Sequence, residues 1–384
     1  MEENMSDGDL LPSRELINLY GQWAKGGAGL LLTGNVMIDK EAMTGPGGVV
    51  LDKNSDLEQF KLWAKVAKQN QCKVWMQISH PGRQVYRKMG GKVFSPSDVA
   101  LDMGKLSDLF GQPTPMTDEQ IEDVIARFAD TAKQAELAGF DGVEVHAAHG
   151  YLIAQFLSPL VNKRDDKWGG TLENRARLLT EVIKAIKSNV SETFNIAVKL
   201  NSADFQRGGF DENDALSVVK SLEALNIDMI ELSGGSYEAP AMQGVTADGR
   251  TLKREAYFLS FAETIAKSTT VPIMTTGGIY KFATAKTVLA QGVDLVGIAT
   301  GLALQPDLPN RWQLGKSVEI AIPKVTWKNK TLRGLAIMAV VKRNLRRVGA
   351  GKAASAKLSP LFTLILDQIR TAKLTKRYQK LMSR

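Results

Sequence analysis

Short apolar runs, rich in β-branched residues, recur along the first 316 residues, and a stretch with helical spacing of apolar positions follows each run. Such near-continuous hydrophobicity is typical of strands buried on both faces, as in a parallel sheet. The runs that we predict to be strands are 29–38, 73–80, 142–149, 195–204, 228–235, 271–279 and 294–302. This alternation predicts an α/β fold, and the number of units favours a closed (β/α)8 TIM barrel over two separate sheets.

The predicted strands are one short of the eight that such a barrel needs. A predicted helix at 13–26 comes before the first run, with no strand ahead of it. We therefore expect strand 1 to be largely missing, either lying upstream of Met1 or ending within residues 1–4. Capping boxes beginning at Ser55 and at Thr117 are expected to start two of the helices, because side chains there satisfy the first backbone N–H groups.

Composition excludes several classes of protein. Hydrophobic residues make up 44% of the chain and charged residues 23%, as in globular proteins generally. The single cysteine, Cys72, excludes an internal disulfide and a four-cysteine zinc or iron–sulfur site in this chain. The start of the sequence does not resemble a signal peptide, and no apolar run approaches the roughly 20 residues of a membrane span. We therefore expect a cytoplasmic protein.

The positive charge is concentrated at the C-terminal end. Residues 317–384 contain sixteen Lys+Arg and two Asp+Glu, whereas residues 1–316 contain 33 and 39. We expect a TIM-barrel domain over 1–316 and a basic helical extension over 317–384, and we expect no nucleic-acid partner, because the barrel itself is mildly acidic. The extension has apolar residues at helical spacing over 335–348 and 361–374. Two interpretations stay open: packing on the barrel or on another subunit of a homo-oligomer, and weak contact with an anionic membrane surface.

Polar residues follow the apolar runs, where TIM barrels build their active sites. All three histidines of the chain fall at such positions. His146 and His149 can direct two donors at one oxygen and stabilise negative charge on it, and Tyr151 carries a hydroxyl that can deliver a proton. The alternative is a structural histidine pair that closes the barrel mouth. A zinc site is not expected, because this pair lacks further His or Cys ligands.

Two glycine-containing turns follow the last two predicted strands. Gly277 and Gly278 end the run at 271–279, and Thr300 and Gly301 lie at the end of the run at 294–302. Glycines let the backbone approach a phosphate closely, and exposed N–H groups bind it. Because the loops after strands 7 and 8 are the usual phosphate position in this fold, we predict a mononucleotide phosphate site there. The alternative is that these glycines only close tight turns.

Three motifs resemble the old yellow enzyme family of NAD(P)H:flavin oxidoreductases. The central one is GFDGVEVHAAHGYLIAQFLSP at 139–159, and NKRDDKWGGTLENRAR at 162–177 continues it. The segment QISHPGR at 77–83 is similar to a third family motif. The resemblance extends in order over roughly residues 1–315 and leaves 327–384 unexplained.

The resemblance implies an ene-reductase with bound FMN, which takes hydride from NADH or NADPH and passes it to an activated alkene such as an enone. His146 and His149 would bind the substrate carbonyl oxygen, and Tyr151 would donate the proton to carbon. The residues that the resemblance implies as cofactor-binding are Gly34, Gln77, Lys199, Gly277, Gly278, Thr300 and Gly301.

The chain departs from the family pattern at three positions. Lys199 stands where the family usually has arginine, which keeps the charge but not the planar fork. Thr300 replaces an arginine that binds phosphate in relatives, and Glu2 falls where relatives have Thr or Cys. The missing strand also leaves open a catalytically silent barrel that acts as a scaffold. The natural substrate depends on loops such as 84–116 and 237–251, and the sequence does not identify it.

Overall fold

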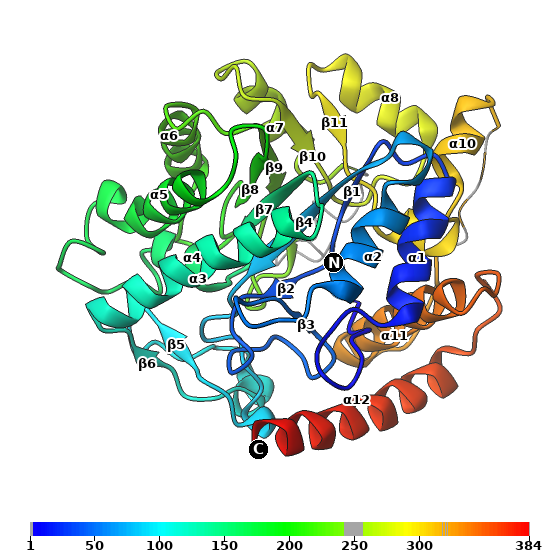
Figure 1. The fold of residues 1–384 in the computed structure, drawn as a ribbon, viewed down its shortest axis with the longest axis horizontal. Coiled ribbons are helices and arrows are strands. Elements are labelled where there is room, and N and C mark those ends of the chain that lie inside the picture. The colour runs from blue at the N-terminus through cyan, green and yellow to red at the C-terminus, as the bar shows by residue number, and fades with distance from the viewer. Residues whose placement is uncertain (1–2, 242–255, 317, 319, 321, 384) are drawn as a thin grey trace.

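The computed structural model describes residues 3–241, 256–316, 318, 320 and 322–383, and it contains one main parallel sheet surrounded by helices (Figure 1). Neighbouring strands follow the order β11-β10-β9-β8-β7-β4-β2-β3, and β1 pairs with β4. Every pairing in this sheet is parallel. The parallel α/β fold predicted from the sequence is therefore confirmed.

Each of the seven predicted runs contains strand structure, and the first one contains two short strands. The strands of the main sheet are β1 (Leu30–Leu32), β2 (Val36–Met37), β3 (Val49–Val50), β4 (Lys73–Ser79), β7 (Gly142–Ala147), β8 (Asn195–Asn201), β9 (Met229–Ser233), β10 (Ile273–Thr275) and β11 (Leu295–Val296). Within the described residues no strand comes before helix α1 (Arg14–Lys25). Glu2 and the first part of the segment 1–4 lie outside the described residues.

The remaining barrel helices are α2 (Glu58–Ala67), α3 (Asp118–Leu137), α4 (Leu152–Leu157), α5 (Leu172–Asn189), α6 (Glu212–Glu223), α7 (Leu259–Ala266), α8 (Phe282–Ala290), α9 (Thr300–Leu304) and α10 (Leu308–Gln313). The capping box at Thr117 is confirmed, since its side chain and that of Gln120 cap α3 reciprocally. The one at Ser55 is wrong, because α2 starts at Glu58, whose N–H donates to Asp56 instead. Ser55 hydrogen-bonds with Asp52 in the preceding turn.

The insertion at 84–116 leaves the sheet after β4 and forms a small unit of its own. It contains two short 3-10 helices, η2 (Arg87–Met89) and η3 (Gly104–Leu109), and a parallel pair of strands, β5 (Phe94–Ser95) and β6 (Thr114–Pro115). Another 3-10 turn, η1 (Gln69–Gln71), lies before β4. The insertion therefore lies over the end of the sheet at which β4 terminates.

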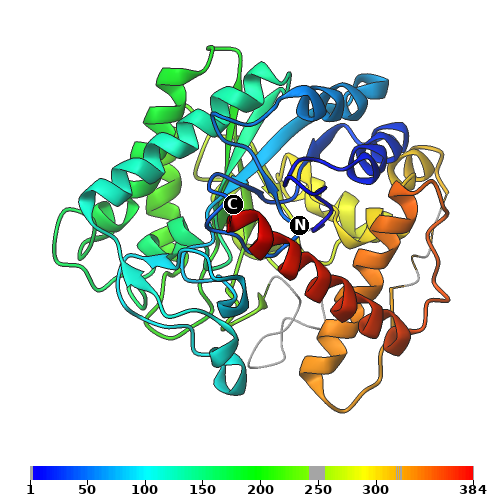
Figure 2. The ribbon, with the colours of Figure 1, turned by 60° about the horizontal axis from the view of Figure 1, so that its bottom comes forward.

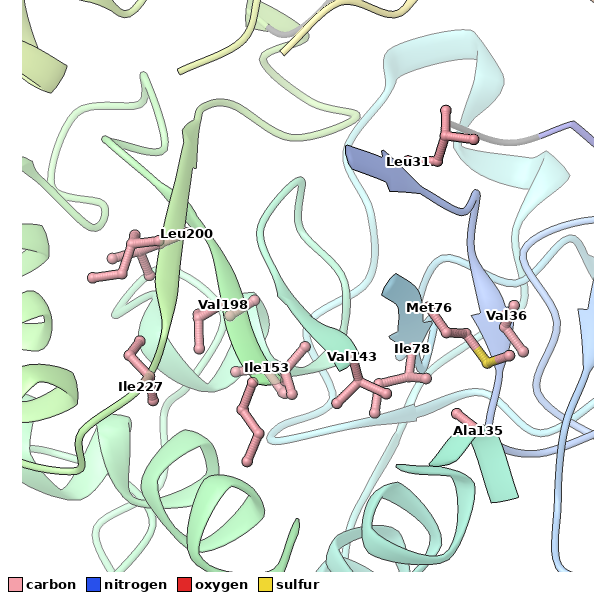
Figure 3. Close-up of a cluster of buried hydrophobic side chains, with 14 of the residues drawn as sticks. Leu31, Val36, Met76, Ile78, Ala135, Val143, Ile153, Val198, Leu200 and Ile227 are labelled. Atoms are coloured by element: carbon pink, nitrogen blue, oxygen red, sulfur yellow. The ribbon is translucent and has the colours of Figure 1, made fainter. Parts of the chain in front are cut away.

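Apolar side chains fill the space between strands and helices. Figure 3 shows Ile78, Val143 and Val198 from successive strands in this layer, with Ala135 of α3 in the same cluster. A second, smaller cluster contains Ala197, Met229 and Met274, with partly buried residues of β1, β4 and β11 packed against it. Residues of β11, at one end of the strand order, and of β1, which pairs with β4, thus share one interior, as side chains inside a barrel do.

The C-terminal extension forms two helices, α11 (Lys330–Gly349) and α12 (Pro360–Met382), which are longer than the apolar periodicity predicted. Helix α11 packs on α1 and on α12. Helix α12 then crosses the face of the molecule towards the 84–116 insertion (Figure 2). The structure thus shows packing on the barrel, which is one part of the first of the two interpretations of this segment. Among the described helices, none has the length and hydropathy of a transmembrane span.

Candidate active site

The candidate site lies where four neighbouring strands end. In the parallel register, Gln77 of β4 is opposite Glu144 of β7, and His146 of β7 is opposite Lys199 of β8. Lys199 is in turn opposite Glu231 of β9. Because parallel strands end at the same edge of a sheet, the register gathers these polar side chains at one end of the fold.

His146, His149 and Tyr151 come together as the sequence predicts. The ring centroid of His146 lies 5.0 Å from that of His149 and 4.8 Å from that of Tyr151. The turn after β7 brings them together through two left-handed residues, His149 (φ 59°) and Gly150 (φ 73°). Tyr151 is then the N-cap residue of α4 and is only 5% exposed.

Hydrogen bonds restrict the tautomers of both histidines. Nδ1 of His146 accepts from the Ala148 N–H at 3.2 Å, so its ring proton is on Nε2. Nε2 of His149 lies 2.7 Å from Ser233 Oγ. Burial lowers the pKa of both imidazoles well below the usual value, and the neighbouring charge of Lys199 lowers each further. Both rings are therefore neutral near pH 7, and each has one nitrogen that can donate and one that can accept.

Asn201 fixes the position of two loops at once. Its Oδ1 accepts from the His149 backbone N–H at 3.0 Å, and its Nδ2 donates to the Gly235 carbonyl at 3.0 Å. Gln84 also donates to the His149 carbonyl at 3.0 Å. The loops after β4, β7, β8 and β9 are thereby joined around the histidine pair.

Charged and polar side chains of the same strands lie buried beside His146. Lys199 Nζ is 2.6 Å from Glu231 Oε1, and Gln77 Nε2 donates to Glu144 Oε2 at 2.6 Å. Burial raises the pKa of Glu144 well above its usual value, and the Glu231 carboxylate raises it further. Burial alone would raise the pKa of Glu231 too, but the charge of Lys199 outweighs it and the pKa lies below the usual value. Of these two glutamates, Glu144 is therefore protonated and Glu231 is ionised.

Gly34 lies in the middle of the loop between β1 and β2, in a buried polar cluster. Its N–H donates to Glu3 Oε1 at 3.0 Å and to the Tyr20 hydroxyl oxygen at 2.9 Å, and that hydroxyl donates to Glu3 at 2.6 Å. The neighbouring Thr33 Oγ1 accepts from the Gln77 backbone N–H. Gly34 is thus next to the Gln77 strand, but its own N–H is already bonded within the protein.

The predicted phosphate-binding residues follow two adjacent strands, β10 and β11. Gly277 and Gly278 both have left-handed backbones, with φ of 106° and 71°. A Cβ at Gly278 would lie 2.7 Å from the Tyr257 ring. Thr300 is the first residue of α9, whereas Gly301 is buried, and a Cβ there would meet Ile298 at 2.9 Å. The two turns are brought side by side, and Gly301 has a packing reason to be glycine.

Several buried polar atoms near this edge have no hydrogen-bond partner within the described residues, and they include Gln77 Oε1 and Thr275 Oγ1. Thr275 ends β10, two residues before Gly277, and Gln77 lies in β4. The oxygens of these two residues therefore lie on either side of strands β7, β8 and β9. Such atoms are costly unless a ligand or water satisfies them. The residues therefore fit a polar cofactor that donates to Gln77 and extends towards the glycine turns. The part of the chain that the structure describes contains no cluster of His, Cys, Asp and Glu suited to a metal.

Sequence reasoning did not identify Glu231, although an acidic residue inside the apolar run MIELS is a usable signal. It also missed the partners of the loop after β9. Tyr237 hydrogen-bonds to Tyr151 through their hydroxyls, at 3.3 Å, and Glu238 forms an ion pair with Arg83 at 2.7 Å. Of the predicted substrate loop at 237–251, residues 242–251 lie outside the described residues.

Comparison with known proteins gives consistent matches. A model of the NADH:flavin oxidoreductase / NADH oxidase family matches residues 3–319. The NADH-dependent flavin oxidoreductase nadA of Aspergillus parasiticus is 37% identical over 337 residues, which cover 86% of this chain and 76% of that protein.

Solved structures are similar over most of the chain. A 2-naphthoyl-CoA reductase in complex with 2-naphthoyl-CoA has a TM-score of 0.74 at 27% identity, and the match covers 82% of this chain but only 49% of that one. The old yellow enzyme homologue from Zymomonas mobilis has a TM-score of 0.70 at 24% identity, with 83% of this chain and 88% of that one covered. These likenesses confirm the predicted TIM-barrel class.

Proposed function

Since this chain belongs to the NADH:flavin oxidoreductase / NADH oxidase family, it is an enzyme that uses FMN and NADH or NADPH, and we propose that it reduces an alkene conjugated to a carbonyl group. The overall reaction consumes the alkene, NAD(P)H and one proton, and it yields the saturated carbonyl compound and NAD(P)+. The contacts among His146, His149 and Tyr151 carry this proposal.

The histidine pair supplies the electrophilic part of the site. As hydride reaches the β-carbon of an enone, negative charge develops on the carbonyl oxygen, and two neutral imidazole N–H donors stabilise it. His146 has its proton on Nε2, as required. His149 has a donor on Nδ1 when Ser233 donates its hydroxyl proton to Nε2. Asn201 holds the His149 backbone in place, so the second donor is positioned before the substrate arrives.

Tyr151 supplies the proton. Its ring contacts His146 at 4.8 Å between centroids, so its hydroxyl belongs to the same small space as the histidine donors. The O–H bond of the phenol breaks as a C–H bond forms at the carbon next to the carbonyl. A positioned general acid of this kind contributes roughly 10²–10⁴-fold to a rate.

FMN supplies hydride transfer when it is bound. We propose that Gln77, Lys199 and Gly34 lie along its ring system, and that its phosphate is held by Gly277, Gly278, Thr300 and Gly301. The unpaired oxygens of Gln77 and Thr275 support this assignment. Lys199 contributes a fixed positive charge there, because Glu231 keeps it ionised.

We also propose that the chain divides into a barrel at 1–316 and a basic extension at 317–384, and that the protein is cytoplasmic. The C-terminal helices bear on its other partners. Homo-oligomer formation and weak contact with an anionic membrane surface stay predictions, supported by the apolar residues that α11 and α12 expose, which include Leu335, Leu361 and Phe362.

The test is turnover of the purified protein with FMN, NADH or NADPH, and 2-cyclohexen-1-one. We expect enone-dependent oxidation of the nicotinamide, and Tyr151→Phe should slow it about 100-fold or more. Ferricyanide, which takes electrons without protonation of carbon, serves as the second acceptor. A protein that reduces ferricyanide but does not reduce the enone would refute the alkene proposal and leave the oxidoreductase class intact. A protein that retains no flavin and turns over neither acceptor would favour the silent scaffold.

A further inference from the structure

Tyr237 stands next to the proposed proton donor. Its hydroxyl oxygen lies 3.3 Å from that of Tyr151, and the two rings meet edge to face at 6.1 Å between centroids. Tyr151 is buried, whereas Tyr237 is partly exposed. The loop after β9 therefore places a second phenol between a buried phenol and the surface.

The same loop is held rigidly by its next residue. Glu238 Oε2 is 2.7 Å from Arg83 Nη2, and Glu238 Oε1 accepts from the Asp102 N–H at 2.8 Å. The Arg83 and Glu238 side chains are only 4% and 11% exposed. Arg83 also donates to the carbonyls of Val99 and Ala100, in the 84–116 insertion. Glu238 thus joins the loop after β9 to the segment after β4, on opposite sides of the site.

The ring of Tyr237 is supported on its other side. It packs against Phe110 at 6.0 Å, and Phe110 stacks on Tyr86 at 4.9 Å. On the near side of the loop, Asn201 donates to the Gly235 carbonyl. The Phe110 ring and the anchored Gly235 backbone therefore restrict the position of Tyr237 beside Tyr151.

We propose that Tyr237 is the proton relay that serves Tyr151, and that the Arg83–Glu238 ion pair positions it. The inference rests on the proposed function. After Tyr151 has given its proton to carbon, its phenolate accepts a proton from the Tyr237 hydroxyl, and Tyr237 takes one from water. The Tyr237 hydroxyl, 3.3 Å away, is a donor of the same chemical type for the buried phenolate.

Tyr237→Phe removes the hydroxyl and keeps the ring. Tyr86→Phe is the matched control, because it removes a hydroxyl from the tyrosine that stacks on the far side of Phe110. With saturating NADH and 2-cyclohexen-1-one, we expect kcat of Tyr237→Phe to fall about tenfold and to recover as imidazole buffer is added, since a small acid can replace the relay. Turnover with ferricyanide should be unchanged, because that acceptor needs no proton on carbon. Tyr86→Phe should match the wild type with both acceptors.

Glu238→Gln provides the second variant. It removes the charge of the ion pair, and we expect a smaller loss of enone turnover that imidazole again reverses. If Tyr151→Phe slows enone reduction but Tyr237→Phe does not, the relay is wrong and the proposed function stands. A loss in Tyr237→Phe that is equal for enone and ferricyanide, or that imidazole leaves unchanged, would also overturn the relay. If Tyr151→Phe keeps the full enone rate, both proposals fail together.

Discussion

The ammonium group of Lys199 lies 2.6 Å from the Glu231 carboxylate inside the barrel, and the two side chains are only 9% and 4% exposed. Burial alone would lower the pKa of Lys199, but the attraction of the Glu231 carboxylate outweighs it, so the pKa lies above the usual value. The lysine therefore keeps its charge beneath the proposed flavin site. Glu144, one strand away, has the opposite state, since its raised pKa keeps it protonated.

This difference predicts opposite outcomes for two matched substitutions. Glu231→Gln leaves the Lys199 ammonium without its counter-ion, and breaking a buried pair in this way costs about 3–5 kcal/mol. Glu144→Gln replaces a protonated carboxyl by an amide of the same shape, so it should not lower the unfolding free energy. Urea unfolding at pH 7 measures both. Equal losses in the two variants would contradict the assignment of the charges.

The pH dependence of the unfolding free energy in wild type and Glu144→Gln gives a second test of the protonation of Glu144. A carboxyl whose pKa is raised by folding binds more protons in the native state than in the unfolded state. Its stabilising contribution is therefore complete below pH 4.5 and is lost as the pH rises towards the raised native pKa. The wild type should lose stability relative to Glu144→Gln across this range.

His80 is predicted to weaken the fold in acid. Burial lowers its pKa to about 4 from the usual 6.5, and its Nδ1 accepts from the Gly82 N–H. Between these two pKa values the unfolded chain binds more protons than the native chain, so stability falls as the pH drops below about 6.5. In His80→Gln the slope of the unfolding free energy against pH should be shallower by up to about 1.4 kcal/mol per pH unit. Coincident slopes for wild type and variant from pH 6.5 to 5, at saturating FMN, would contradict this.

The glycine turn after β10 is predicted to be needed for flavin binding. Gly278 has φ of 71°, and a Cβ there would lie 2.7 Å from the Tyr257 ring. In Gly278→Ala this turn must shift, and we expect the dissociation constant of FMN to rise about tenfold or more, equivalent to about 1.4 kcal/mol. Fluorescence titration of the apoprotein with FMN measures it.

Gly292 offers a matched control for backbone strain. Its φ of 86° is also left-handed, but a Cβ there would meet nothing within 4 Å. Gly292→Ala should therefore cost about 1–2 kcal/mol of stability without weakening FMN binding. If Gly278→Ala binds FMN as tightly as Gly292→Ala does, the phosphate is not held at this turn.

The sequence predicted most strands of the main sheet, but not β3, and it predicted that the polar residues at their ends lie together, because both depend on local order. An apolar run followed by a polar residue marks a strand end, and the parallel fold brings strand ends together, so His146, His149 and Tyr151 could be placed beforehand. The capping box at Ser55 failed because a short polar turn offered Asp56 as a competing acceptor.

The contacts that complete the site could not be predicted in this way. Tyr151 and Tyr237 are 86 residues apart, and Arg83 and Glu238 are 155 apart. Their pairing depends on how long loops pack over the strand ends, which no local periodicity encodes. Glu231 was recognisable as an acidic residue in a buried strand, but only the register of β8 and β9 assigns it to Lys199.

The last prediction concerns how the C-terminal helix is attached. Tyr378 of α12 is 2% exposed and lies in a cluster with Met37, Met43 and Met89, and its hydroxyl donates to the Lys40 carbonyl at 2.7 Å. Burial raises its pKa to about 12, so the phenol stays neutral. This side chain therefore joins α12 to the loop after β2 and to the 84–116 insertion, far from α11 along the helix.

Tyr378→Ala removes a buried aromatic ring, which typically costs about 3–5 kcal/mol. Because the rest of α12 exposes much of its surface, we expect the loss to appear as release of the end of this helix while the barrel stays folded. Hydrogen exchange should speed up over 371–382 in Tyr378→Ala. It should not do so in Phe362→Ala, which truncates a side chain on the same helix that is 53% exposed. Tyr378→Phe should have a small effect of about 1 kcal/mol, because only the hydrogen bond to Lys40 is lost. Equal protection of this segment in Tyr378→Ala and wild type would mean that α12 is held by its contacts with α11, and that the buried tyrosine contributes little.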